Sequence, residues 1–146
     1  MSPGRELNTD IYRRRFEGDS DFRKEMYSIL CESFFQKYIP KESSILEIGA
    51  GYCEFINAIE AKKKIALDIN PDIRLYAYDN IEVIIGKSIQ MLYIEDESVD
   101  RVIANNFFEH LTKADIIQTL HEVHRVLKPE GKILARLSAY SSFPGG

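Results

Sequence analysis

The chain has few of the residues that form disulfides or bind metal ions in small domains. Its 146 residues include two cysteines, Cys31 and Cys53, and three histidines. The two cysteines match neither a disulfide framework nor a zinc-binding spacing. His121 and His124 share one predicted helix without a third candidate ligand. We therefore expect reduced thiols, no metal site and a cytoplasmic protein.

The sequence also lacks a basic excess and any long apolar run. Its formal net charge is −4 and its pI is about 5.4, whereas proteins that grip nucleic-acid backbones carry a basic surface. No stretch reaches the roughly 18 consecutive apolar residues of a membrane span, and the first residues lack the apolar region of a signal peptide. We expect neither a nucleic-acid partner nor a membrane.

What remains is the composition of a globular domain, with 45% hydrophobic and 29% charged residues. We expect residues 1–43 to form an arm and a covering helix, with Tyr12 and Phe16 as candidates for a lid. From Asp21, apolar residues at three- and four-residue steps predict an amphipathic helix that ends before Pro40. Its expected buried stripe is Phe22, Met26, Ile29, Leu30, Phe34 and Tyr38.

The most informative segment, residues 45–55, is an apolar run followed by two glycines. The run from Ile45 is typical of a short buried parallel strand. Gly49 and Gly51 allow a tight turn and the close approach of a ligand. A helical pattern follows, with three apolar residues on one face: Phe55, Ile56 and Ile59.

The acidic residues around this turn indicate the charge of the ligand. A dinucleotide fingerprint requires a third glycine at position 54, where this chain has Glu54. A carboxylate there would repel a pyrophosphate, and Glu47 at the strand end adds a second acid. The turn therefore favours a ligand with a positive group.

A second predicted strand ends with another acid, Asp68. An acid in this position, about twenty residues after the glycine turn, can accept hydrogen bonds from both hydroxyls of a ribose. Asp68 would otherwise be a helix cap. Because Asn70 and Pro71 already supply a cap and a first-turn proline, Asp68 is left for the ligand.

The remaining pattern predicts three further strands and one long helix. The strands are expected at 81–85, 102–104 and 132–137. The helix begins near Thr112, which forms a near capping box with Asp115, and ends by Pro129. Its expected buried stripe is Ile116, Ile117, Leu120, Val123 and Leu127. The alternation predicts an α/β, doubly wound Rossmann-like parallel sheet of five strands in the order 3-2-1-4-5.

The sequence Glu47, Gly49, Gly51 matches acid, any, Gly, any, Gly and resembles the first motif of the class I S-adenosylmethionine-dependent methyltransferases, small-molecule type. Asp68 and Ile69 resemble the second motif, and the resemblance extends over residues 44–137. It implies that S-adenosylmethionine is the cofactor. Glu47 would hold its ammonium, the turn including Ala50 would admit its backbone, Asp68 would bind the ribose and Ile69 would lie against adenine.

Two positions depart from this family. Cys53 stands where the family often has a third glycine, inside the start of the helix. Lys87 stands where the family commonly has an acid that meets the adenine amino group. A lysine cannot accept that hydrogen bond, so the Ser88 hydroxyl is the candidate in its place.

The segment after the fourth strand resembles the family's fourth motif. Asn105 and Asn106, at the carboxyl end of that strand, are candidate contacts to the methionine part of the cofactor or to the acceptor. His110, or alternatively Glu109, is the candidate general base, needed only for a hydroxyl acceptor. The run from Asn105 to Phe108 also mimics the motif of nucleic-acid amino-methyltransferases, but without its prolines, and the acidic charge disfavours that class.

The resemblance implies methyl transfer to a small-molecule or sugar-like acceptor. A NAD(P)-dependent oxidoreductase or epimerase is a second possibility, disfavoured by Glu54 and by the lack of a Tyr-x-x-x-Lys pair. A non-catalytic cofactor-binding module is a third. The core, residues 44–146, lacks the last two strands of the family, so we expect cofactor binding with poor turnover, and a fifth strand with a bare edge that suits a homodimer.

Overall fold

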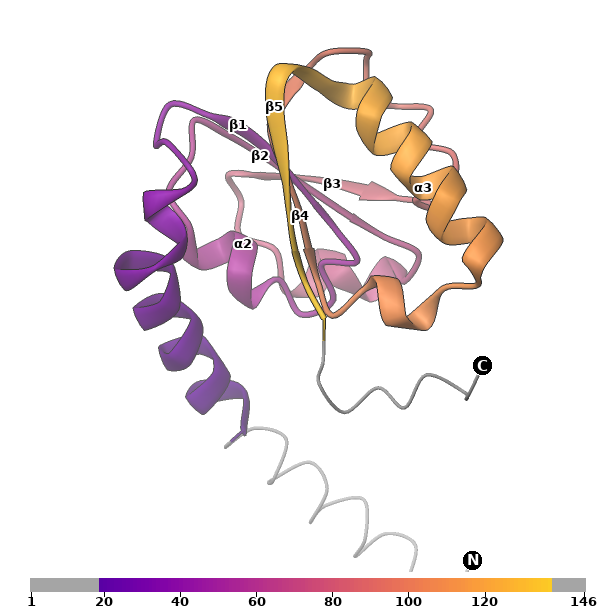
Figure 1. Ribbon diagram of the computed structural model, residues 1–146. Coiled ribbons are helices and arrows are strands. Elements are labelled where there is room, and N and C mark those ends of the chain that lie inside the picture. Colours follow the sequence, from indigo (N-terminus) through magenta and orange to yellow (C-terminus); the bar gives the residue numbers. More distant parts are fainter. Residues whose placement is uncertain (1–18, 138–146) are drawn as a thin grey trace, which may run out of the picture.

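The computed structural model describes residues 19–137 (Figure 1). Tyr12 and Phe16 lie outside this range, so the predicted lid stays a prediction. Within the range, no helix combines the length and the apolar character needed to cross a membrane.

The core is a five-stranded sheet in the order β3-β2-β1-β4-β5, with every pair parallel. Its strands are β1 (Ser44–Ile48), β2 (Lys63–Asp68), β3 (Ile81–Ile85), β4 (Val99–Asn105) and β5 (Leu127–Arg136). The predicted fold class and strand order are confirmed. Among the described residues β5 pairs with β4 alone, which leaves its other edge bare.

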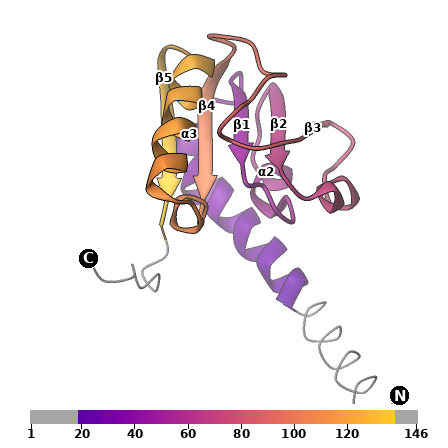
Figure 2. The ribbon, with the colours of Figure 1, turned by 90° about the vertical axis from the view of Figure 1, so that its right-hand side faces the viewer.

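Helices cover both faces of the sheet (Figures 1 and 2). On one face pack the N-terminal helix, residues 19–33, and the short α2 (Glu54–Ala58); on the other packs α3 (Lys113–Val126). Side chains alternate along β1, so Ile45 joins the first core and Leu46 joins the second. Three short 3₁₀ helices complete the described chain: η1 (Phe35–Lys37), η2 (Pro71–Leu75) and η3 (Phe108–His110).

The N-terminal helix forms as predicted but buries a different face. A row spaced by four residues, Tyr27, Cys31 and Phe35, packs into the core, with Ile39 beyond it. Four of the six residues expected to be buried are exposed: Phe22, Ile29, Phe34 and Tyr38. The prediction was wrong because Tyr27 and Cys31 pack as apolar residues, which shifts the buried row by one position.

The buried stripe of α3 is also shifted. Thr112 caps the helix as predicted, accepting a hydrogen bond from the Asp115 amide at 3.2 Å. The buried residues are Thr119, Val123 and Val126, whereas Ile117 and Leu120 are exposed. Leu120 instead faces a groove of about 390 Å³ beside β5, because the sheet ends at that strand.

The fifth strand begins earlier than the predicted Lys132. Leu127 already pairs with Val99, and the next pair is Arg101 with Lys132. The residues between form a bulge, in which Glu130 has a φ of 68°. The proline and glycine that we expected to precede the strand therefore lie within it.

Candidate active site

The glycine turn connects β1 to α2 through left-handed backbone. Gly49 and Gly51 have φ values of 68° and 55°, and Cys53, the N-cap of α2, has a φ of 61°. This conformation explains why the family often has glycine where this chain has Cys53. The amides of Gly49 and Ala50 donate to the Leu67 carbonyl at 2.8 and 3.2 Å, which fixes the turn against β2.

Asp68 ends β2 beside this turn. One carboxylate oxygen accepts the Gly51 amide at 2.8 Å, and the other accepts the Asn70 amide at 2.9 Å. Asn70 caps η2 through the Asp72 amide at 3.0 Å, as predicted. A carboxylate has about four acceptor positions, so Asp68 retains capacity for a ligand.

A cavity of about 410 Å³ opens at the carboxyl ends of the strands. This volume is within the range of small-molecule sites. Its lining includes residues from the end of each of the first four strands, among them Gly49, Asp68, Ile69, Ser88 and Phe107. In open parallel sheets, ligands bind at this edge, where the strand order reverses.

The two glycines differ in their surroundings. A Cβ on Gly49 would collide with the Phe107 ring, which packs directly over the turn. A Cβ on Gly51 would meet no atom within 4 Å. The backbone is therefore covered by an aromatic ring at Gly49 and open at Gly51.

Glu47 is buried on β1 with one unsatisfied oxygen. Its Oε2 accepts the Asn105 side-chain amide at 3.2 Å, and its Oε1 has no hydrogen-bond partner. Burial is the main cause that raises the pKa of Glu47 to about 8; the hydrogen bond from Asn105 opposes the rise, and the negative charges of Glu54 and Asp68 contribute to it. Glu47 and Asp68 are therefore close enough to interact electrostatically at one end of the sheet, although Glu47 does not line the cavity.

Glu54 forms an ion pair with another side chain, and the two cysteine thiols are buried and protonated. Glu54 pairs with Arg23 of the N-terminal helix at 2.8 Å. Burial raises the pKa of Cys31 and of Cys53 to about 12. Neither thiol is therefore a nucleophile near neutral pH.

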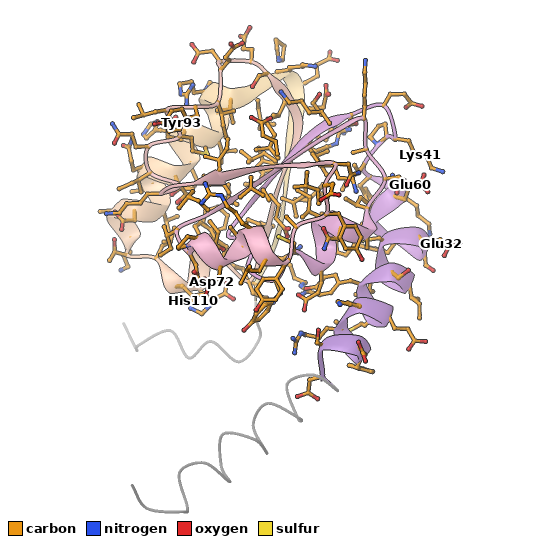
Figure 3. The ribbon with its side chains drawn as sticks, turned by 180° about the vertical axis from the view of Figure 1, so that it is seen from behind. Glu32, Lys41, Glu60, Asp72, Tyr93 and His110 are labelled. Carbon is orange, nitrogen blue, oxygen red and sulfur yellow. The ribbon has the colours of Figure 1, made fainter. Side chains whose placement is uncertain are left out.

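The two candidate bases point to different places. His110 is exposed on η3 (Figure 3) and lines the cavity with Asp68. Glu109 lines the apolar groove beside β5, and its Oε2 is buried without a partner. The geometry therefore brings His110, and not Glu109, to the cavity.

The segment after β3 is tied to α3. The Ser88 hydroxyl lies 2.7 Å from that of Thr119, and both residues are buried. Lys87 lines the cavity beside it.

Some lining residues were not among the sequence candidates. Phe107 and Leu111 line the cavity together with the candidate Asn106, whereas the candidate Asn105 turns to Glu47. Their position directly after the fourth strand was a usable signal. Asp115 lines it too, from the first turn of α3, and no sequence signal pointed there. Among residues 19–137, no group of three or more His, Cys, Asp or Glu side chains is arranged to hold a metal ion.

Comparison with known proteins agrees with this geometry. A protein of Schizosaccharomyces pombe named as methyltransferase-like is 36% identical to the chain, over 65% of the chain and 38% of its own length. A second protein of that organism, named as a methyltransferase, is 34% identical, over 89% of the chain and 51% of its own length. The chain thus spans about half or less of each. A phosphoethanolamine N-methyltransferase of Haemonchus contortus, solved with phosphoethanolamine and S-adenosylhomocysteine, shares the fold with a TM-score of 0.65 and 20% identity, over 96% of this chain and 34% of that one.

The family match covers most of the sheet. The model of the methyltransferase domain aligns with residues 46–135, from β1 to the end of β5. Because this is more than half of the sequence, the chain belongs to the methyltransferase domain family.

Proposed function

We propose that this protein binds S-adenosylmethionine in the cavity between Gly49 and Asp68 and transfers its methyl group to a small-molecule or sugar-like acceptor. The family and its structural neighbours indicate this cofactor. The observation that carries the proposal is the hydrogen bond from Gly51 to Asp68, which joins the glycine turn to an acid that lines the cavity.

The residues present fit an adenosyl ligand with a positive charge. Asp68 accepts the ribose hydroxyls with its remaining lone pairs. Gly51 leaves room for the ligand beside the backbone. Ile69, whose side chain is 70% exposed, offers an apolar surface to the base.

Glu47 supplies the negative charge that the ammonium group of the ligand needs. Its orphan oxygen is a buried acceptor without a donor, which is costly unless a ligand or a water molecule supplies one. A cationic partner would favour the ionised carboxylate and lower its pKa from about 8.

The cofactor supplies an activated methyl group, open to in-line attack at the carbon on sulfur. The protein's contribution is mainly alignment, which can supply roughly 7 kcal/mol or more when the reacting atoms are held at near-attack distance. For a hydroxyl acceptor, His110 takes the proton, because its imidazole lines the same cavity. An acceptor that is already a nucleophile needs no base.

Titration calorimetry with S-adenosylhomocysteine and with NAD tests this function. We expect S-adenosylhomocysteine to bind and NAD not to, because the turn has Glu54 where a dinucleotide site requires its third glycine. Binding of NAD alone would favour the oxidoreductase. Cofactor binding without turnover on a panel of amine, hydroxyl and sugar acceptors would favour a binding module.

A further inference from the structure

The cavity extends beyond the glycine turn to the first turn of α3. Besides Gly49 and Asp68, it is lined by Lys87 and Ser88 after β3 and by Asp115 of α3. These last three side chains are the polar groups that the far strand and the helix bring to the site. They decide what the cavity accepts at that end.

Two hydrogen bonds hold α3 against the segment after β3. The hydroxyls of Ser88 and Thr119 lie 2.7 Å apart in a buried position. The Gln118 side-chain amide donates to the Ile89 carbonyl at 3.2 Å. The Ser88 hydroxyl is therefore buried against the helix, and the same contacts hold α3 beside the cavity.

Asp115 lines this end of the cavity, and its carboxylate is unengaged. Its backbone amide donates to Thr112, but its carboxylate has no hydrogen bond or ion pair with any described residue. Asp68, the other acid that lines the cavity, already accepts two backbone amides. Lys87 lines the cavity as well and forms no ion pair with Asp115.

We infer that Asp115 recognises the adenine of the cofactor by accepting a hydrogen bond from its exocyclic amino group. This inference rests on the proposed function. An ionised acceptor binds an amino group more strongly than a neutral one. Lys87 cannot accept such a bond, and Ser88 already bonds to Thr119. The specificity-determining acid thus comes from α3 rather than from the end of β3.

The test compares two ligands that differ at the base. S-Adenosylhomocysteine carries the amino group, whereas S-inosylhomocysteine carries a carbonyl oxygen at the same position. The wild-type protein should bind the amino ligand at least about tenfold more tightly, because the carbonyl oxygen would face a carboxylate. In Asp115→Asn the new amide can donate to that oxygen, so the preference should fall to about one or reverse.

Asp72→Asn is the matched control, because it removes one exposed carboxylate from the first turn of η2 (Figure 3). It should keep the wild-type preference. An equal loss of affinity for both ligands in Asp115→Asn, or equal binding of both by the wild-type protein, would overturn the role of Asp115. If the wild-type protein bound neither ligand, the proposed function itself would fail. Equal binding by the wild-type protein overturns the proposal even if the variant does not fold, whereas support for it requires the folded Asp115→Asn protein.

Discussion

The carboxylate of Asp68 accepts a hydrogen bond from the backbone amide of Gly51 at 2.8 Å. The end of β2 is thereby fastened to the glycine turn that follows β1. One residue thus shapes the turn and, under the proposed function, offers its remaining lone pairs to the ribose. The two roles can be separated by measuring stability and ligand affinity in the same variant.

Asp68→Ala should lower the affinity for S-adenosylhomocysteine by about 1 to 3 kcal/mol, because the charged hydrogen bonds to the ribose are lost. It should also lower the free energy of unfolding by about 1 kcal/mol through the freed amides of Gly51 and Asn70. Calorimetry and urea denaturation measure the two effects. Asp72→Ala, which removes a surface acid nearby, serves as the control. An unchanged affinity in Asp68→Ala would contradict the ribose assignment.

Gly49→Ala should destabilise the fold by about 2 to 4 kcal/mol. The new Cβ would collide with the Phe107 ring, and the positive φ of 68° is strained for any residue with a side chain. Gly86→Ala is the matched control, because its Cβ would make an ordinary 3.7 Å contact with Leu67. Thermal or urea denaturation of both variants provides the measurement, and equal losses would contradict the close packing of Phe107.

The positions of the strands were predicted from the sequence more accurately than the buried face of each helix. The run from Ile81 to Ile85 is a strand within its predicted bounds, because four of its five residues are apolar and Gly86 follows it. The buried face of a helix is harder to predict, because a shift of the buried row by one residue turns a different face inward. Tyr27 and Thr119 pack inward, which shifts both helices relative to the rows counted from strongly apolar residues.

The residues of the site likewise fall into those that the sequence pattern predicts and those that it does not. The positions of Gly49, Gly51 and Asp68 follow from local pattern, because each ends or follows a predictable strand. Asp115 lies far along the chain and reaches the cavity through side-chain contacts of α3 with the segment after β3. No local pattern encodes such a contact.

Arg125→Ala should destabilise the protein by about 1 to 3 kcal/mol. The guanidinium joins α3 to the segment before β4 through three groups at 2.8 Å: the carbonyls of Met91 and Ile94 and the carboxylate of Asp96. It also binds the carboxylate of Glu122, on α3 itself, at 2.6 Å. Its loss leaves partly buried acceptors unsatisfied. Urea denaturation should show this loss, while Arg74→Ala, on the surface of η2, should change little. Equal effects would contradict the network.

The stability of the cofactor-free protein should fall between about pH 4.5 and pH 8 because of Glu47. Burial raises its folded pKa from 4.5 to about 8, so over this window the unfolded chain loses a proton that the folded chain keeps. The effect amounts to about 3 to 5 kcal/mol at about 1.4 kcal/mol per pKa unit. Glu47→Gln should match the wild type near pH 4.5 and exceed it at pH 8. Parallel pH profiles of the two proteins in urea denaturation would contradict the raised pKa.

The same carboxyl group should release a proton when the cofactor binds. At pH 7 a pKa of about 8 keeps most Glu47 side chains neutral in the free protein. The ammonium of S-adenosylhomocysteine favours the ionised form, so binding should expel close to one proton and tighten from pH 6 to pH 8. Calorimetry in phosphate and in Tris buffers measures this proton, because the two buffers take it up with different enthalpies. Glu60→Gln should release it as the wild type does, since the exposed Glu60 pairs with Lys41 at 2.7 Å and its pKa is lowered. Glu47→Gln should bind more weakly without proton release, and buffer-independent enthalpies in the wild type would place the ammonium elsewhere.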